Sequence, residues 1–132
     1  MTDNTFSPLE SSAYLSLATR KRSGEFVQTP VWFAPDDGVY YLFSAGDAGK
    51  VKRLRNFSTS RIAPCTVTGR VTGDWVDTTA FLVSDPQEIE RALAALRRKY
   101  GWQMRGLDAL SRLGGKLHKR AYIRVEPSSP NG

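Results

Sequence analysis

The 132-residue sequence has little of what disulfides, metal sites and hydrolytic triads require. Cys65 is its only cysteine, which excludes a disulfide or a thiolate metal cage within one chain. His118 is its only histidine, which excludes a histidine metal cluster and argues against a histidine-centred triad. We therefore interpret Cys65, which follows Pro64, as a small buried hydrophobic residue and expect no metal site.

Long apolar stretches are also absent. No run approaches the roughly 18 apolar residues that span a bilayer. The start of the sequence, 1–5, is polar and acidic rather than basic and then apolar, so we expect neither export nor a membrane partner. A single cysteine fits a reducing, cytoplasmic location. The length predicts one domain over residues 1–132, with loose tails at 1–6 and 127–132.

Acidic residues are outnumbered, with 13 Asp and Glu against 19 Lys and Arg, which gives a formal charge of +6. Such an excess calls for an anionic partner: nucleic acid, an acidic membrane surface or a polyanionic cofactor. The basic and aromatic cluster at 97–103 is of a kind that nucleic-acid surfaces use, but it is equally an ordinary helix terminus. Because the basic residues lie on several segments rather than one stripe, we expect no nucleic-acid partner.

Capping and turn signals divide the chain into helices and strands. A capping box at Ser7–Glu10, followed by Leu9, Tyr14 and Leu17, predicts a first helix that ends near Thr19. Further helices are predicted at 49–57, 85–101 and 104–113, and strands at 26–33, 39–44, 61–67, 75–83 and 121–125. Tight turns between strands favour a mainly β, antiparallel sheet that curls into a barrel with flanking helices.

The most informative segment is the basic helix predicted at 49–57, which follows a strand and a turn that begins at Gly46. A turn that opens a helix leaves backbone N–H groups unpaired, and the helix dipole adds partial positive charge there. Lys50 and Arg53 lie three apart on one helical face. This arrangement can hold a phosphate or a carboxylate; the alternative interpretation is a solvated basic face.

A second unusual segment is the strand that contains Pro30. Proline cannot donate to a strand ladder, so it occurs at edges or bulges and leaves nearby backbone open to a ligand. As structure, the segment is an edge proline beside core aromatics; as a site, Thr29 to Trp32 could form a wall for a flat ring. No set of catalytic side chains is complete, so in an enzyme a cofactor would carry the reaction.

Taken together, six segments match a known family in order and at plausible spacing. They are Tyr14–Thr19, Thr29–Phe33, Ser44–Ala45, Gly49–Asn56, Arg61–Cys65 with Gly69 and Gly73, and Arg98–Gly101. In these segments the chain resembles the pyridoxamine-phosphate-oxidase-like split β-barrel family, and within it the actinobacterial branch of deazaflavin-dependent reductases.

The resemblance implies a six-stranded antiparallel split β-barrel that forms a homodimer, with a cofactor in a groove at the interface. The cofactor would be coenzyme F420, a deazaflavin with a phosphate and a polyglutamate tail, or FMN as in sister branches. Neutral Thr29 and Ala34 stand where flavin-phosphate oxidases tend to place basic residues, which favours the deazaflavin. A C-terminal Arg-x-His pairing is not visible, which argues against vitamin B6 chemistry.

The implied activity is hydride transfer from the reduced deazaflavin to a conjugated small-molecule acceptor, with no catalytic side chain assigned. The alternatives are an FMN-binding oxidoreductase and a carrier that binds the cofactor without turnover. The resemblance also implies a set of cofactor-binding residues. They are Thr29, Pro30, Val31 and Trp32 along the ring, Ala63, Pro64 and Cys65 nearby, and Ser44 at the phosphate or the ring edge. Gly49, Lys50 and Arg53 would hold the phosphate, Lys52, Arg55 and Asn56 would lie toward the tail, and Val51 completes the set. A substrate pocket would be shaped partly by 102–104.

Overall fold

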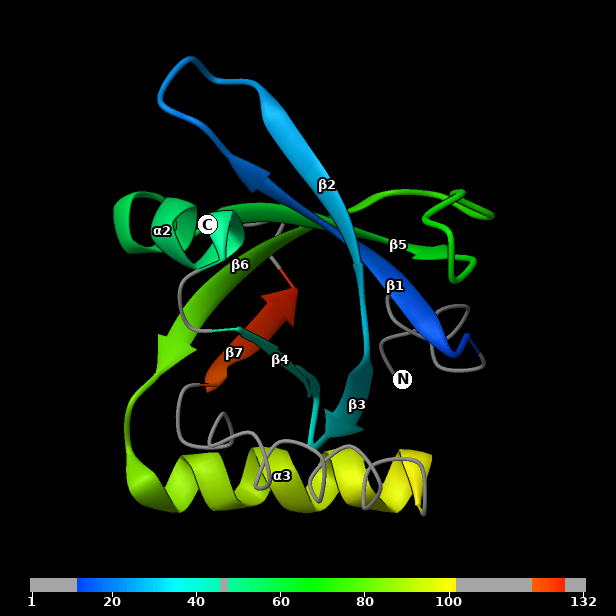
Figure 1. Cartoon of the computed structure of the whole chain (residues 1–132), viewed down its shortest axis with the longest axis vertical. Coiled ribbons are helices and arrows are strands. Elements are labelled where there is room, and N and C mark those ends of the chain that lie inside the picture. Colours follow the sequence, from blue (N-terminus) through cyan, green and yellow to red (C-terminus); the bar gives the residue numbers. More distant parts are fainter. Residues whose placement is uncertain (1–11, 46–47, 102–119, 128–132) are drawn as a thin grey trace.

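The computed structural model describes residues 12–45, 48–101 and 120–127, which form one antiparallel sheet and two helices (Figure 1). The strands are β1 Tyr14–Arg20, β2 Phe26–Val31, β3 Phe33–Asp36, β4 Val39–Ala45, β5 Thr59–Cys65, β6 Val76–Val83 and β7 Arg120–Pro127. The helices are α2 Gly49–Asn56 and α3 Pro86–Tyr100. The seven strands are ordered β2-β1-β5-β6-β7-β4-β3 across the sheet.

The two edge strands of this sheet, β2 and β3, are consecutive in the chain and are separated only by Trp32. The chain itself therefore joins the two edges, although no β2–β3 ladder closes the barrel. Each edge strand contains a proline, Pro30 or Pro35, as expected where a missing N–H disturbs no central ladder.

The expected six strands are corrected to seven, partly because the predicted strand 26–33 is two strands. The chain changes partners at Trp32: β2 pairs with β1, whereas β3 pairs with β4. The hydroxyl of Tyr100 fixes this corner, since it accepts a 2.9 Å hydrogen bond from the Phe33 N–H. It also lies 2.8 Å from the Ala13 carbonyl oxygen, to which it can donate its single proton.

The prediction of a first helix that ends near Thr19 was wrong where the structure describes this segment, because Tyr14–Arg20 is strand β1. Alternate residues Leu15, Leu17 and Thr19 share one face, which is the period of a strand, and all three are fully buried. β1 also pairs on both sides, with β2 and with β5. The two ladders outweigh the weak helical preference of its Leu, Ser and Ala residues.

The other predicted elements within the described residues are confirmed, with boundaries that differ by two residues or fewer. Asp37 and Gly38 both have positive φ, 51° and 86°, which suits the tight turn between β3 and β4. Asp85 caps α3 by accepting a hydrogen bond from the Gln87 N–H. The predicted capping box at 7–10, the turn at Gly46, the helix at 104–113 and His118 lie outside the described residues.

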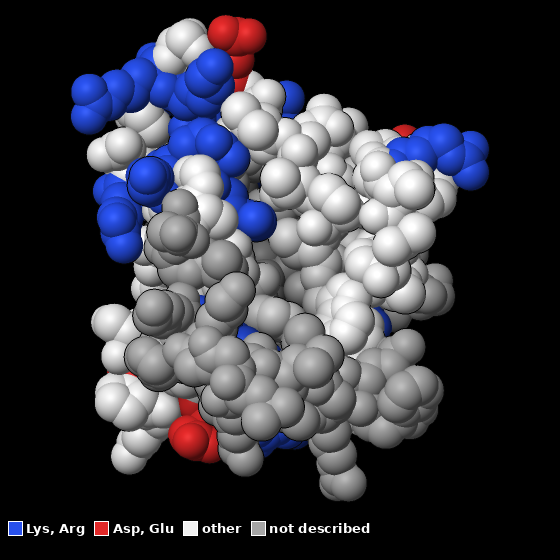
Figure 2. All heavy atoms as spheres, in the orientation of Figure 1, with Lys and Arg blue, Asp and Glu red and all other residues white. Residues whose placement is uncertain are grey.

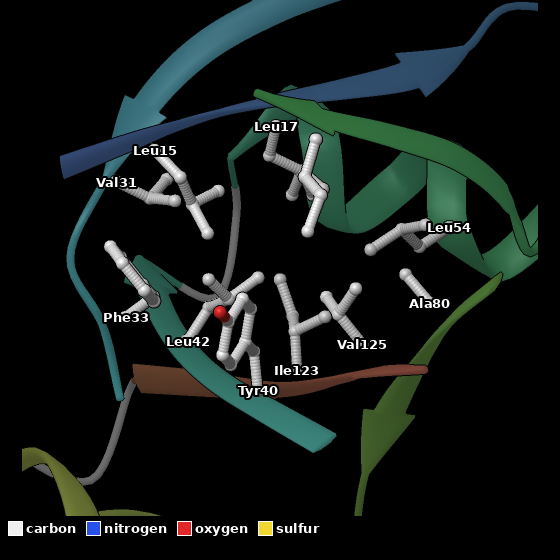
Figure 3. Close-up of a cluster of buried hydrophobic side chains, with 11 residues drawn as sticks. Leu15, Leu17, Val31, Phe33, Tyr40, Leu42, Leu54, Ala80, Ile123 and Val125 are labelled. Atoms are coloured by element: carbon white, nitrogen blue, oxygen red, sulfur yellow. The ribbon is translucent and has the colours of Figure 1, made fainter. Parts of the chain in front are cut away.

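The main core fills the space between the curled strands (Figure 3). Leu15 and Leu17 of β1 point toward Leu42 of β4 and Ile123 of β7, and all four side chains are fully buried. Leu54 of α2 enters the same cluster, so the helix packs one face into the barrel. Burial of Leu54 therefore fixes which face of α2 is turned outward.

A second apolar cluster joins α3 to the outside of the sheet. Ala92 and Leu96 of α3 are buried against Tyr41 of β4 and Tyr122 of β7. The helix lies along the end of the barrel beside β3 (Figure 1). No helix in the described part of the chain has the length and apolar content to cross a membrane.

Candidate cofactor-binding site

The basic helix α2 begins without a side-chain cap. Its N-cap residue, Ala48, has no hydrogen-bonding side chain, and the first turn contains no acidic residue. The uncapped end therefore keeps the partial positive charge of the helix dipole. Val51 and Leu54 are buried, so Lys50 and Arg53 lie at the margin of the packed face and are only partly exposed.

Arg53 is held in place over the first turn of α2. Its Nε donates a 2.6 Å hydrogen bond to the Oγ1 of Thr19 in β1. A Cβ atom added at Gly49 would lie 2.9 Å from Nη1 of Arg53, which is too close for an ordinary contact. Glycine at this position thus leaves room for the guanidinium beside the helix start. The Arg53 guanidinium is therefore held beside the backbone N–H groups at the start of α2. Together these groups offer the hydrogen-bond donors and the positive charge that a phosphate needs.

Lys50 lies beside Arg53 at the start of α2, and it forms no ion pair with an acidic side chain of the described residues. Burial and the nearby Arg53 guanidinium, in that order, lower the pKa of Lys50. Both effects penalise the charged amine. A bound anion would relieve the repulsion between these two cations, and the phosphate site at Lys50, Arg53 and Gly49 stays a prediction.

A cationic partner for α2 that the sequence analysis missed is the turn between β1 and β2. Arg20 places its guanidinium carbon 4.5 Å from the ring centroid of Phe57, the residue that follows α2. Lys21 and Arg22 come next in the turn and are exposed. Figure 2 shows Lys and Arg gathered over α2 and this turn. We call this set the cationic corner: Arg20, Lys21, Arg22, Lys50, Lys52, Arg53 and Arg55.

The run Arg20-Lys21-Arg22 was visible in the sequence, but nothing in the sequence placed it beside 49–57. Two contacts do so in the structure, Arg53 to Thr19 and Arg20 to Phe57. The hypothesis of a helix in place of β1 concealed this relationship. Within the turn, the Lys21 N–H donates to the Glu25 carbonyl oxygen, and Gly24 has a φ of 94°.

Thr29 of β2 lies on the same side of the sheet as this corner. It is paired with Leu17, whose neighbour two residues along β1 is Thr19, the partner of Arg53. Paired and alternate residues share a face, so Thr29 and Thr19 are one row apart on it. The Oγ1 of Thr29 is buried and has no hydrogen-bond partner in the structure. A ligand atom at this position would satisfy it.

The other residues predicted to surround the ring are arranged around β1. Pro30 and Ala63 flank Ser16 in one row, and Val31 and Pro64 flank Leu15 in the next. The segments 29–31 and 62–64 therefore lie level with each other across the sheet, with β1 between them. The two sets face opposite sides of the sheet, because successive residues of a strand do.

Cys65 ends β5 opposite Tyr14 and is buried, as interpreted from the sequence. Burial raises the pKa of the Cys65 thiol, so the thiolate is disfavoured. Among the described residues, no group of three His, Cys, Asp or Glu is arranged to hold a metal ion.

Trp32, which was predicted along the ring, packs in the apolar cluster beside α3 rather than in the cationic corner. The Trp32 ring stacks on Tyr100 with centroids 4.4 Å apart and meets Phe43 edge-on at 6.2 Å. One face of its indole is therefore already covered. Ser44 is buried near the end of β4, opposite Ala121.

The rest of the predicted set lies on α2 or beyond the described residues. Arg55 and Asn56 are exposed, and Asn56 donates to the carbonyl oxygen of Lys52 within the helix. Val51 is buried as part of the helix face that packs on the barrel. The residues 102–104, predicted to shape a substrate pocket, lie outside the described part.

Comparison with known proteins identifies similar folds. No family model and no curated protein sequence matches the chain. Among solved structures, HutZ, the heme storage protein of Vibrio cholerae, has a TM-score of 0.68 at 17% identity, over 90% of this chain and 84% of that one. The protein named "putative pyridoxamine 5′-phosphate oxidase" of Listeria innocua has a TM-score of 0.64 at 15% identity, over 96% and 93%. An FAD-binding protein of Mesorhizobium loti has a TM-score of 0.60 at 17% identity, over 92% and 83%.

The chain shares its overall fold with these three proteins. At identities below 20%, these three similarities establish the architecture and leave the ligand to be argued from the residues.

Proposed function

We propose that this protein binds coenzyme F420 and is a deazaflavin-dependent reductase. The observation that carries the proposal is the contact of Arg53 with Thr19 above Gly49, which places a fixed guanidinium beside an uncapped helix start. Arg53 and Lys50 would hold the cofactor phosphate together with the Gly49 amide. The unpaired hydroxyl of Thr29, one row away on the same face, would bind an edge of the ring.

The role of the protein in this proposal is to bind and orient. A reduced deazaflavin supplies a hydride to an electron-poor, conjugated acceptor. β1 and β2 provide a rigid wall that is anchored at one end by Tyr100 and at the other by Arg53. No protein nucleophile is needed, which fits a buried Cys65 whose raised pKa keeps it protonated. Val31 and Pro64, which share the face of Thr29, would pack near the ring, whereas Pro30 and Ala63 point to the other side of the sheet.

FMN is the alternative cofactor, because it also carries a phosphate and a flat ring. The FAD-binding neighbour of similar fold supports it. Two features favour the deazaflavin: Thr29 is neutral, and the cationic corner extends well beyond what a single phosphate would occupy.

The second alternative is a carrier that binds the cofactor at the same site without turnover. Only an assay with substrate distinguishes a carrier from a reductase.

We also propose a homodimer, in keeping with the groove that the resemblance implies. Three large apolar side chains are exposed on the surface and could be buried in such an interface: Val67, Trp75 and Phe81. Analytical ultracentrifugation of the purified protein tests this point, and a monomer at micromolar concentration would refute it.

The first experiment is a side-by-side titration of the purified protein with coenzyme F420 and with FMN. Tryptophan fluorescence and cofactor fluorescence would both be followed. Binding of the deazaflavin with at least tenfold preference would support the proposal and justify a screen of conjugated acceptors with the reduced cofactor. Preference for FMN would assign the site to a flavin, and binding of neither would refute the proposed function.

A further inference from the structure

The loop that joins β5 to β6 repeats a short sequence that ends in glycine (Figure 1). Residues 66–69 have the sequence TVTG and residues 70–73 have the sequence RVTG. Each glycine lies against a proline of the sheet: Gly69 against Pro30 of β2, and Gly73 against Pro64 of β5. The loop therefore contacts the two strands that flank β1.

The two glycines are required for different reasons. Gly69 has a φ of 95°, in the left-handed region that favours glycine, and a Cβ atom there would lie 3.7 Å from Pro30, an ordinary contact. Gly73 is not among the described glycines with a positive φ, so its conformation is open to other residues. A Cβ atom there would lie 2.6 Å from Cγ and 3.3 Å from Cδ of Pro64. Glycine at 73 is therefore needed for space, because the loop backbone closely approaches the pyrrolidine of Pro64.

A bulge in the returning chain produces this approach. Cys65 and Val71 form an isolated bridge, and the regular ladder begins at the pair of Ile62 with Val76. Between these two pairings, β5 contributes residues 63–64 and the returning chain contributes residues 72–75. The longer chain must bulge, and bulges commonly redirect a segment toward a functional site.

Pro64 belongs to the face of the sheet that carries the proposed ring site. It flanks Leu15 in the same row as Val31, on the face of Thr29, whose Oγ1 is buried without a hydrogen-bond partner. Proline has a fixed φ, and the backbone at Gly73 leaves its pyrrolidine little room to move. Because close-packed groups transmit strain to their neighbours, a displacement of Pro64 would change the shape of this face.

We propose that Gly73 is a positioning residue of the ring site. By admitting the loop backbone against Pro64, it fixes the wall that the cofactor ring meets. This inference rests on the proposed function, since a ring must lie on the face of Thr29 for Pro64 to border it. The β5–β6 loop then influences affinity for the ring and leaves the phosphate site on α2 unaffected.

The experiment separates the ring from the phosphate. The deazaflavin riboside, which has the ring but no phosphate, and intact coenzyme F420 are both titrated by fluorescence. Inorganic phosphate is then titrated as a competitor of coenzyme F420 at constant ionic strength. These measurements compare the wild type with Gly73→Ala and Lys50→Ala, after urea unfolding has shown which variants are folded.

Gly73→Ala should bind the riboside and coenzyme F420 about fivefold to fiftyfold more weakly than the wild type, as expected when an added methyl group overpacks a binding wall. Its inhibition constant for inorganic phosphate should equal that of the wild type. Lys50→Ala should give the reverse pattern, because it removes a phosphate contact and leaves the wall intact.

Pro64→Ala tests the wall without a clash, and it removes both atoms that a methyl group at 73 would meet. Alone, it should weaken riboside binding about twofold to tenfold, since the wall loses two methylene groups. Gly73→Ala/Pro64→Ala should bind the riboside as Pro64→Ala does, so the two substitutions should not be additive. A role of Gly73 in folding alone would not produce this result.

Gly69→Ala is the matched control in the same loop. Its positive φ strains an alanine and should lower the free energy of unfolding, but its contact with Pro30 is ordinary. Pro30 points to the other side of the sheet from Thr29. Gly69→Ala should therefore bind the riboside as the wild type does.

A folded Gly73→Ala that binds the riboside normally would overturn the inference while the proposed function stands. Normal binding by Pro64→Ala, additive losses in the double variant, or an equal loss in Gly69→Ala would do the same. If the wild type bound coenzyme F420 but not the riboside, the inference alone would fail, because the wall would contribute no affinity of its own. Failure of the wild type to bind coenzyme F420 would overturn both.

Discussion

Arg53 of α2 and Thr19 of β1 are 34 positions apart in sequence, and the Arg53 Nε donates a 2.6 Å hydrogen bond to the Thr19 Oγ1. This contact joins the basic helix to the strand that lies between the two segments predicted to surround the ring. Thr19 is fully buried, so the bond is shielded from solvent. In the proposed site, Thr19 would therefore contribute to phosphate binding by positioning Arg53, without contacting the cofactor itself.

Thr19→Val tests this dependence, because it keeps the shape of the side chain and removes only the acceptor. We expect affinity for tail-less coenzyme F420 to fall about threefold to tenfold, since the guanidinium loses its fixed position while keeping its charge. Titration by fluorescence measures the effect. Thr72→Val, in the exposed β5–β6 loop, is the matched control and should bind as the wild type does. Unchanged affinity in Thr19→Val would show that Arg53 does not need this anchor.

Lys50→Ala tests the phosphate contact itself. Loss of a charge-assisted contact of roughly 1.5–3 kcal/mol should weaken binding of the tail-less cofactor by about tenfold to a hundredfold. The matched control is Lys52→Ala, an exposed lysine on the same helix, which should have little effect on the tail-less form. If Lys50→Ala bound the cofactor normally, the phosphate would have to lie elsewhere.

The same lysine gives the site a pH dependence with a definite sign. Its pKa is lowered by burial and by Arg53, so Lys50 loses its proton at a lower pH than an ordinary lysine. A bound phosphate stabilises the charged form and raises this pKa again. We expect affinity to decrease as the pH rises through the lowered pKa of the free protein, below the usual 10.5 of lysine. The Lys50→Ala variant should lack this decrease, which titrations between pH 7 and 10 can check.

Much of the fold could be predicted from the sequence, because its signals are local. The Asp37-Gly38 turn and the Asp85 cap depend on neighbours in the chain, and the elements that they begin, predicted at 39–44 and 85–101, were confirmed. Strand β1 was mistaken for a helix because its identity depends on two distant partners, β2 and β5. The bend at Trp32 is equally non-local, since the hydroxyl that fixes it belongs to Tyr100.

The candidate site likewise has a part that local sequence predicts and a part that depends on contacts between distant segments. The basic helix was predicted at 49–57 from its own residues, and the structure has it at Gly49–Asn56. The contribution of Arg20, Lys21 and Arg22 was missed, because it arises only when β1 lies against α2. The unpaired hydroxyl of Thr29 was likewise invisible, since burial of a hydroxyl without a partner is a property of packing.

Glu88 should contribute a pH-dependent part of the free energy of unfolding. Its carboxylate accepts a 2.8 Å hydrogen bond from Nη1 of Arg124 and a 2.9 Å bond from the Tyr41 hydroxyl, which fasten α3 to the sheet. These contacts, the Arg124 hydrogen bond first, lower the pKa of Glu88. A lowered pKa means that the contribution is present above the usual carboxyl pKa of 4.5 and is lost as the pH falls through the lowered value.

Glu88→Gln should therefore reduce the free energy of unfolding by about 1–3 kcal/mol at pH 7. The difference from the wild type should shrink in acid, where Glu88 becomes protonated. Urea unfolding at pH 7 and at pH 3 to 4 measures both values. Glu90→Gln, at an exposed position of the same helix, is the control and should change the free energy little. A difference that stayed constant with pH would show that the charge of Glu88 contributes nothing.

Tyr100→Phe tests the corner between β2 and β3. The substitution leaves the Phe33 N–H without its partner in a buried place, which should lower the free energy of unfolding by about 1–3 kcal/mol. Burial raises the pKa of Tyr100 to about 12, so its contribution is complete below the usual value of 10 and is lost between about pH 10 and 12. The gap between wild type and variant should narrow over that range in urea unfolding.

Tyr122→Phe is the matched control for this experiment, because Tyr122 is buried against the same helix and its hydroxyl makes no hydrogen bond within the described part of the chain. It should change the free energy of unfolding by less than about 0.5 kcal/mol. The affinity of Tyr100→Phe for the cofactor gives a second measurement, since the corner between β2 and β3 orients β2. If Tyr100→Phe lowers the free energy of unfolding no more than Tyr122→Phe does, the hydroxyl is not needed at the corner. The stacking of Trp32 on Tyr100 and the core around Phe33 would then be sufficient to hold it.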